Sequence, residues 1–120
     1  MSKKKILIFD DDIATLEVVS IIFKDLGYHV EISETADDIL SKVHIFQPDL
    51  IMMDVSIPVI GGIEATRLLK SHDVYNNIPV MIITANNDVA KLSEKASANA
   101  YMSKPFDLND LEDKVARLIL

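Results

Sequence analysis

The stretch Asp49-Leu50-Ile51-Met52-Met53-Asp54 places four apolar residues in a row between two aspartates. Continuous rather than alternating hydrophobicity is typical of a strand buried on both faces, as in a parallel sheet. Similar runs occur at residues 6–9 and 80–84, and weaker ones at 28–33 and 100–103. The sequence therefore predicts five short strands.

Longer segments with helical spacing lie between these runs. The first repeats apolar residues at steps of three or four, which places them on one helical face: Ile13, Leu16, Val19, Phe23 and Leu26. Gly27 is predicted to end this helix, because glycine tolerates a positive φ. Thr35 is predicted to cap the second helix, which Pro48 ends.

Three further helical segments are predicted at about 62–69, 88–96 and 108–120. Strand and helix thus alternate five times, which is the pattern of a doubly wound α/β domain with right-handed crossovers. No internal repeat and no linker rich in Gly, Ser or Pro interrupts the 120 residues, a length that suits one hydrophobic core. We expect a single domain over residues 1–120.

Composition narrows the function classes. The chain is 49% apolar and 26% charged, a globular profile, and no apolar run approaches the ~20 residues needed to span a bilayer. Cysteine is absent, which excludes disulfides and thiolate metal sites. The net charge of −7 argues against nucleic acid as a direct partner, because phosphate binding needs a basic face. We expect a cytoplasmic protein that does not contact the membrane.

Polar side chains follow four of the five predicted strands, whereas the second strand ends without a distinctive group. They are Asp10, Asp11 and Asp12 after the first strand, Asp54 after the third, Thr84 after the fourth and Lys104 after the fifth. Ligands of open parallel sheets bind at the carboxyl ends of the strands. We therefore expect these side chains to meet at one edge of the sheet, with Asp12 acting as the N-cap of the first helix.

This set of side chains suits phosphoryl transfer. Clustered carboxylates repel one another and need protons or a cation at neutral pH, and Mg²⁺ prefers such oxygen ligands. A lysine and a hydroxyl supply donors for phosphate oxygens, and positioning with charge neutralisation dominates this chemistry. A carboxylate can itself be the nucleophile, giving an aspartyl phosphate. Asp54 is the best candidate, since it is the single acid at the end of the most central apolar run.

Five motifs occur in order along the chain: Ile6-Leu7-Ile8-Phe9-Asp10-Asp11-Asp12, Asp49-Leu50-Ile51-Met52-Met53-Asp54, Ile57-Pro58 with Gly62, Ile82-Ile83-Thr84-Ala85, and Tyr101-Met102-Ser103-Lys104-Pro105-Phe106. Together they resemble the response-regulator receiver domain of two-component signalling, in the CheY-like superfamily. The resemblance implies a parallel five-stranded sheet of order 2-1-3-4-5 with flavodoxin-like topology. It also implies a single-domain response regulator that is not an enzyme beyond its own phosphorylation and dephosphorylation.

For the metal, the resemblance implies that Asp11 and Asp54 ligate Mg²⁺ directly, together with the backbone carbonyl of Ser56. Asp10 would act mainly through metal-bound water. Asp54 would accept the phosphoryl group from a phosphohistidine on a sensor histidine kinase or a histidine phosphotransfer protein.

For the phosphoryl group, the resemblance implies that Lys104 pairs with its oxygens, and that the Thr84 hydroxyl and the Ala85 N–H complete the anion site. The Lys104–Pro105 peptide bond is expected to be cis. Phosphorylation would draw Thr84 inward and let the Tyr101 ring turn in behind it. A downstream protein or a second copy of the domain would read the face formed by the fourth helix, the fifth strand and the fifth helix.

The chain departs from the family pattern at Ile60, Gly61 and Ser97, where relatives often have methionine, an acidic residue and glycine. Ser56 and Asn86 flank the expected phosphoryl site, where variation in the family bears on the lifetime of the phosphate.

Three other functions are weighed against this prediction. A flavodoxin-like cofactor binder needs a phosphate loop rich in Ser, Thr and Gly after the first strand, but here that loop is acidic. An aspartyl-phosphate phosphatase typically has a second acid two residues after the nucleophile, where this chain has Ser56. A degenerate receiver that acts only as a protein-interaction module is the remaining alternative, and the intact Asp11, Asp54, Thr84 and Lys104 argue against it.

Overall fold

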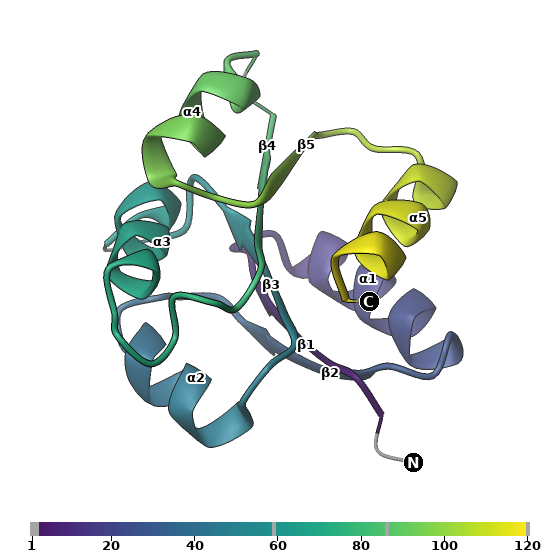
Figure 1. The fold of residues 1–120 in the computed structure, drawn as a ribbon. Coiled ribbons are helices and arrows are strands. Elements are labelled where there is room, and N and C mark those ends of the chain that lie inside the picture. The colour runs from purple at the N-terminus through teal and green to yellow at the C-terminus, as the bar shows by residue number, and fades with distance from the viewer. Residues whose placement is uncertain (1–2, 59, 86, 120) are drawn as a thin grey trace.

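The computed structural model describes residues 3–58, 60–85 and 87–119, and strand and helix alternate along it (Figure 1). The strands are β1 (Lys5–Phe9), β2 (His29–Ser33), β3 (Leu50–Asp54), β4 (Val80–Thr84) and β5 (Ala100–Ser103). The helices are α1 (Ile13–Asp25), α2 (Ile39–Phe46), α3 (Gly62–Lys70), α4 (Val89–Ala96) and α5 (Leu108–Ile119). The predicted alternation is therefore confirmed; Leu120, the predicted last residue of the final helix, lies outside the described residues.

The five strands form one parallel sheet of order β2-β1-β3-β4-β5. This order, which the family resemblance implied, makes β1 and β3 direct neighbours, with Ile6 opposite Leu50 and Phe9 opposite Met53. The strand order reverses between β1 and β3, and in open α/β sheets the crevice at this point is where ligands bind. The topology thus brings the end of the first strand beside the end of the third.

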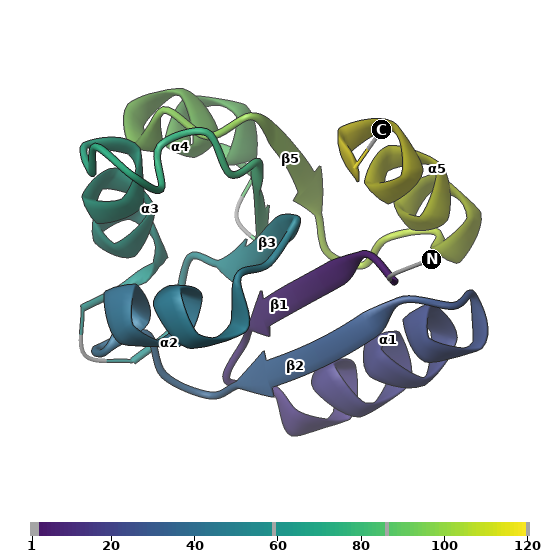
Figure 2. The same cartoon turned by 60° about the horizontal axis from the view of Figure 1, so that its bottom comes forward.

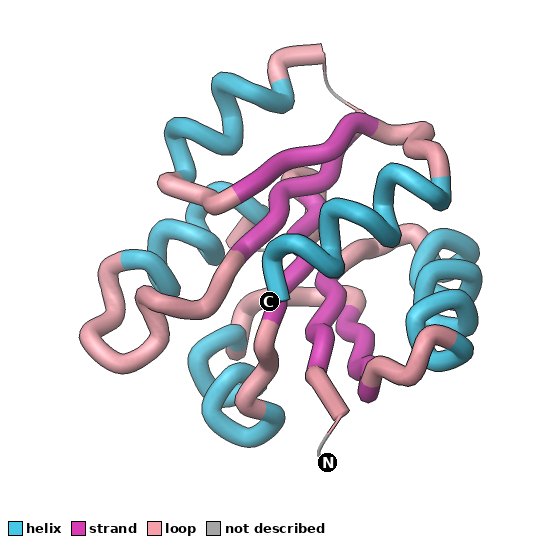
Figure 3. Tube along the Cα trace, turned by 45° about the vertical axis from the view of Figure 1, so that its right-hand side comes forward, coloured by secondary structure: helices cyan, strands magenta, loops and turns pink. Residues whose placement is uncertain are grey.

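Two layers of helices cover the sheet (Figure 1). Helices α2, α3 and α4 lie on one face and pack on a core that includes Leu7, Phe9 and Ile51. Helices α1 and α5 lie on the other face over a core that includes Ile8 and Met52; α5 crosses in front of the strands in Figure 3. Successive residues of β1, β3 and β4 therefore enter opposite cores, which explains why the sequences of these strands are continuously apolar.

The outer strands are less buried than the inner ones. Every residue of β3 and β4 is buried, whereas β2, at one edge of the sheet in Figure 2, buries only Val30. Strand β5, at the other edge, buries only Met102. The weaker apolar runs of the sequence are thus the two edge strands, because an edge strand has a neighbour on one side only.

Helix ends differ from prediction at two places. Thr35 does not cap the second helix: α2 begins at Ile39 with Asp38 at the N-cap position. The Thr35 carbonyl instead accepts hydrogen bonds from the Ser33 hydroxyl and the Lys42 ammonium, so Thr35 belongs to the loop after β2. In α1 the predicted apolar face is buried only in its middle, and Ile13 at the start and Leu26 beyond the end are about half exposed.

Among the described residues, no helix combines the length and the apolar character that crossing a bilayer would require.

Candidate functional site

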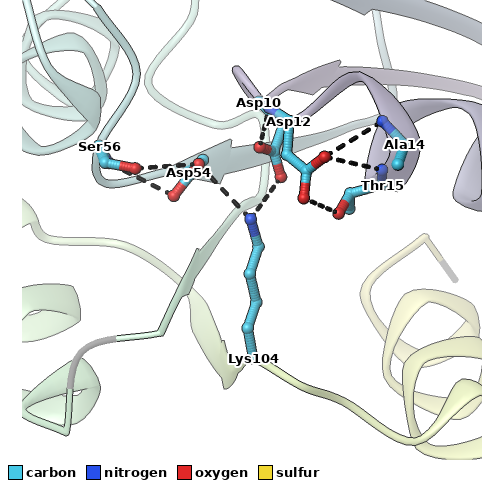
Figure 4. A network of polar contacts seen from close by, with 7 residues as sticks. All are labelled: Asp10, Asp12, Ala14, Thr15, Asp54, Ser56 and Lys104. Atoms are coloured by element: carbon cyan, nitrogen blue, oxygen red, sulfur yellow. Dashed lines mark hydrogen bonds and ion pairs between the residues drawn. The ribbon is translucent and has the colours of Figure 1, made fainter.

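The predicted acidic edge forms where β1 and β3 end side by side (Figure 4). Asp10 follows the last residue of β1 and is completely buried, and Asp54 is the last residue of β3 with 3% of its surface exposed. Asp11 is exposed. Burying an ionised carboxylate is unfavourable unless a partner compensates its charge, so two such groups on adjacent strands require a cation.

Three carboxylates converge at this edge. One oxygen each from Asp10, Asp11 and Asp54 lies within 4.8 Å of the others. A purely carboxylate donor set suits a hard divalent cation such as Mg²⁺, which is usually held by one or two protein carboxylates together with water and phosphate oxygens. The side chains present therefore fit the predicted metal.

The ammonium of Lys104 brings a positive charge into this cluster of acids (Figure 4). It follows the end of β5, and its ammonium lies 2.7 Å from a carboxylate oxygen of Asp10 and 3.5 Å from one of Asp54. Its backbone N–H donates to the Thr84 carbonyl at 2.8 Å, which fixes it to the end of β4. The Lys104–Pro105 peptide bond is cis, as the resemblance implied.

The carboxylate of Asp54 also accepts hydrogen bonds from its own loop. The Ser56 N–H donates to one oxygen at 3.3 Å and the Ser56 hydroxyl donates to the other at 3.2 Å. Burial, followed by the hydrogen bond and negative charge of Asp10, raises the pKa of Asp54 to about 6. Lys104 and the Ser56 N–H act in the opposite direction but do not cancel this effect.

Burial and neighbouring charges also act on the pKa of Lys104, as they do on that of Asp54. Burial alone lowers the pKa of this ammonium, but its contacts with Asp10 and Asp54 outweigh burial and hold the pKa above the usual value. One lysine therefore faces the two buried carboxylates of Asp10 and Asp54, and the exposed carboxylate of Asp11 adds a third negative charge to the cluster. The arrangement has an excess of negative charge that a divalent cation would neutralise.

Asp12 stands beside the cluster with a structural role. Its carboxylate accepts the N–H groups of Ala14 and Thr15 and the hydroxyl of Thr15, so it is the N-cap of α1 as predicted (Figure 4). The Asp12 N–H in turn donates to the Asp10 carboxylate at 2.9 Å. The cap therefore holds the loop between β1 and α1 against the first carboxylate of the site.

The remaining predicted residues differ in how deeply they are buried. Thr84 is buried at the end of β4, and Ala85 is exposed immediately after it. Tyr101 lies on β5 with 42% of its surface exposed, and the Lys114 ammonium sits over its ring at 5.4 Å. The structure therefore brings Thr84 to the edge of the site and leaves Tyr101 on the outer surface; Asn86 lies outside the described residues.

Sequence reasoning missed two features of the site. The Ser56 hydroxyl bonds to Asp54, although only its backbone was predicted to take part. The end of β2 carries a polar network after all, because the Lys42 ammonium from α2 donates to the Ser33 hydroxyl. The first contact joins residues two apart and was readable from their spacing, whereas the second depends on how α2 packs.

Comparison with known proteins gives one consistent result. A family model described as the response regulator receiver domain matches residues 6–116. The CAI-1 autoinducer sensor kinase/phosphatase CqsS of Vibrio cholerae is 32% identical over 117 residues, which are 95% of this chain and 17% of that protein. The chain spans about half the length of other curated relatives that it matches.

Solved structures agree with the sequence comparison. The chemotaxis response regulator CheY4 of Vibrio cholerae has a TM-score of 0.88 at 26% identity, with 98% of this chain and 99% of that one covered. The receiver domain of sensor histidine kinase PA1611 from Pseudomonas aeruginosa PAO1, solved with a magnesium ion coordinated in its active site cleft, has a TM-score of 0.89 at 26% identity, with 98% of each chain covered.

Proposed function

Because the chain belongs to the response regulator receiver domain family, the signalling modules of two-component systems, we propose that Asp54 accepts a phosphoryl group in an Mg²⁺-dependent reaction. The observation that carries the proposal is the convergence of Asp10, Asp11 and Asp54 with the ammonium of Lys104. Within this set Asp54 is the last residue of β3, a strand buried along its whole length, and one of its carboxylate oxygens lies 3.5 Å from the lysine ammonium.

Receiver domains typically bind Mg²⁺, and the PA1611 receiver was solved with this ion in its cleft. In this chain the carboxylates of Asp11 and Asp54 and the backbone carbonyl of Ser56 would hold the ion, with Asp10 acting mainly through bound water. When bound, the ion neutralises the clustered acids and the incoming phosphoryl oxygens. The excess negative charge of the cluster supports this assignment.

In the proposed reaction an oxygen of the Asp54 carboxylate attacks the phosphorus of a phosphohistidine. The P–N bond breaks, an acyl phosphate forms, and the donor histidine keeps the electron pair of the broken bond. Lys104 pairs with the phosphoryl oxygens, and the Thr84 hydroxyl and the Ala85 N–H complete the anion site. The donor is a sensor histidine kinase or a histidine phosphotransfer protein.

The output of the proposed switch is the face made by α4, β5 and α5. Thr84 moves toward the phosphoryl group, and the Tyr101 ring leaves its exposed position and turns inward behind it. A downstream protein or a second copy of the chain reads the altered face. The net charge of −7 supports a protein partner over nucleic acid, and a cytoplasmic location remains a prediction from composition.

The proposal is tested by incubating the protein with Mg²⁺ and acetyl phosphate and measuring its intact mass. We expect one phosphoryl adduct that requires Mg²⁺ and is absent from Asp54→Asn. Asp12→Asn is the matched control, since asparagine is an equally good N-cap and this variant should still form the adduct. No adduct on the wild-type protein, even with a phosphoramidate donor and a short quench, would favour a degenerate receiver that acts only as an interaction module.

A further inference from the structure

The first turn of α3 lies against the peptide that carries Asp54. Gly62, the first residue of α3, is buried, and a Cβ placed on it would overlap the carbonyl oxygen of Asp54. The same Cβ would lie 2.8 Å from the carbonyl carbon of Asp54 and 2.8 Å from the Cα of Val55. These atoms belong to backbone, so they cannot turn away as a flexible side chain would.

Gly62 differs in kind from the other two glycines of the chain. Gly27 and Gly61 have φ angles of +96° and +81°, and a Cβ on either would meet nothing within 4 Å. Those two positions need glycine for its backbone conformation. Gly62 is helical and needs glycine for space, and the space it leaves is filled by the backbone of Asp54.

Two hydrogen bonds hold Gly62 in contact with the Asp54 peptide, one through its N–H and one through its carbonyl. The Gly62 N–H donates to the Val55 carbonyl at 3.0 Å, and this hydrogen bond joins the two ends of the loop between β3 and α3. The hydroxyl of Thr66, which is completely buried one turn further along α3, donates to the Gly62 carbonyl at 2.8 Å. Because this hydroxyl bonds within its own helix, it fixes the geometry of the turn that touches Asp54.

The closed loop carries Ser56, whose N–H and hydroxyl both donate to the Asp54 carboxylate. A displacement of the first turn of α3 would therefore move the Asp54 peptide and the Ser56 backbone together. We propose that Gly62, supported by Thr66, is a positioning residue that sets the Mg²⁺ affinity of the site by holding Asp54 and Ser56 in place opposite Asp10 and Asp11. The proposal rests on the function proposed above, because it concerns the same metal site.

The expected effect follows from the stiffness of metal sites. Groups that orient the ligands without touching the ion typically change metal affinity about 10–100-fold when they are altered. In Gly62→Ala either α3 or the Asp54 peptide must move, so we expect Mg²⁺ binding to weaken by about this factor. Thr66→Val keeps the shape of the side chain and removes only its hydroxyl, so we expect a smaller loss of Mg²⁺ affinity, below about tenfold.

The test is a Mg²⁺ titration followed by ¹H–¹⁵N NMR spectra, which report the folded state and the dissociation constant in one experiment. Gly27→Ala is the matched control: it loses a glycine with a positive φ far from the site, so its stability should fall while its Mg²⁺ affinity stays at the wild-type value. Gly62→Ala should bind Mg²⁺ more weakly than both wild type and this control.

Each outcome decides one question. If Gly62→Ala binds Mg²⁺ as tightly as Gly27→Ala does, the positioning role is wrong. If Gly62→Ala does not fold, Thr66→Val decides: weaker binding supports the role, and unchanged binding overturns it. If the wild-type protein shows no Mg²⁺-dependent shifts, the proposed function itself fails. If the wild-type protein binds Mg²⁺ and Gly62→Ala binds it equally well, only the positioning role fails.

Discussion

Strands β1 and β3 bury two opposite kinds of side chain. Residues within the strands are apolar, whereas the aspartates at the strand ends are charged. Ile8 and Ile51, within the strands, lie in apolar cores that helices cover on both faces. Asp10 and Asp54 are equally buried but carry charges, and burial raises the pKa of Asp54 to about 6. The strand bodies stabilise the fold, whereas the strand ends oppose it unless Lys104 or a cation compensates their charge.

This contrast explains why the site sits where it does. The close-packed central strands β1 and β3 hold the two carboxylates at a fixed separation, so neither carboxylate can move away from the other. The repulsion that remains favours a bound cation and then the oxygens of an incoming phosphoryl group. Three predictions test the contrast, from the largest expected change in stability to the smallest, and a fourth, smaller one concerns the end of a helix.

The first prediction concerns the strand body. Ile51→Ala should lower the free energy of unfolding of the Mg²⁺-free protein by about 2–5 kcal/mol, because it leaves a cavity at a completely buried position. Urea denaturation followed by circular dichroism measures the change. Ile45→Ala is the matched control, since Ile45 is 80% exposed and its loss should change stability by less than about 0.5 kcal/mol. Equal losses in the two variants would contradict the assignment of Ile51 to the core.

The second prediction removes the Lys104 ammonium from beside the aspartates at the strand ends. Lys104→Met should lower the free energy of unfolding at pH 8 without Mg²⁺ by about 2–4 kcal/mol, because Asp10 loses its 2.7 Å partner. Added Mg²⁺ should restore part of this loss. Lys114→Met is the comparison, since the Lys114 ammonium donates to the Tyr101 carbonyl at 2.8 Å and lies 5.4 Å from the centroid of the Tyr101 ring, away from the buried acids. A Lys104 variant no less stable than the Lys114 variant would show that Lys104 does not compensate the buried acids.

The third prediction removes an acid instead. Asp54→Asn should raise the free energy of unfolding of the Mg²⁺-free protein at pH 8 by roughly 1–3 kcal/mol, since the amide carries no buried charge. The pKa of Asp54, about 6, lies above its ordinary value of 3.8, so the folded state binds this proton more tightly than the unfolded state. The stability that the proton confers is complete below pH 3.8 and is lost as the pH rises through about 6.

The gain from Asp54→Asn should therefore be small in acid and reach its full size above about pH 6. Urea denaturation of both proteins between pH 4 and pH 8 follows this dependence. With saturating Mg²⁺ the difference should shrink or reverse, because the wild-type carboxylate gains a metal partner. A gain that is largest at low pH would contradict the raised pKa.

The same contrast governs what the sequence could reveal. Strand bodies are readable because apolar runs buried on both faces are continuous, and the acids Asp10, Asp11 and Asp54 were predicted to meet because parallel strands deliver their ends to one edge. The cap predicted at Thr35 was wrong because α2 begins only at Ile39, and Thr35 lies in the preceding loop, where its carbonyl accepts hydrogen bonds from Ser33 and from Lys42 of α2. The close approach of Gly62 to Asp54 could not be predicted from the sequence. Residue spacing does not show which glycines are required because a Cβ would overlap a neighbour and which because their φ is positive.

The smallest prediction uses a backbone feature far from the acids. Ser97, at the end of α4, has a φ of +61°, a left-handed conformation that suits glycine and strains a serine. Ser97→Gly should therefore raise the free energy of unfolding by up to about 1 kcal/mol, reduced by the extra flexibility of glycine in the unfolded chain. Ser71→Gly is the matched control, because Ser71 ends α3 at a φ of −92° and its hydroxyl bonds to the Arg67 carbonyl, so the same substitution should destabilise. Opposite signs in urea denaturation would confirm that backbone conformation decides the effect. A loss of stability in Ser97→Gly would show that the left-handed turn places no strain on the serine.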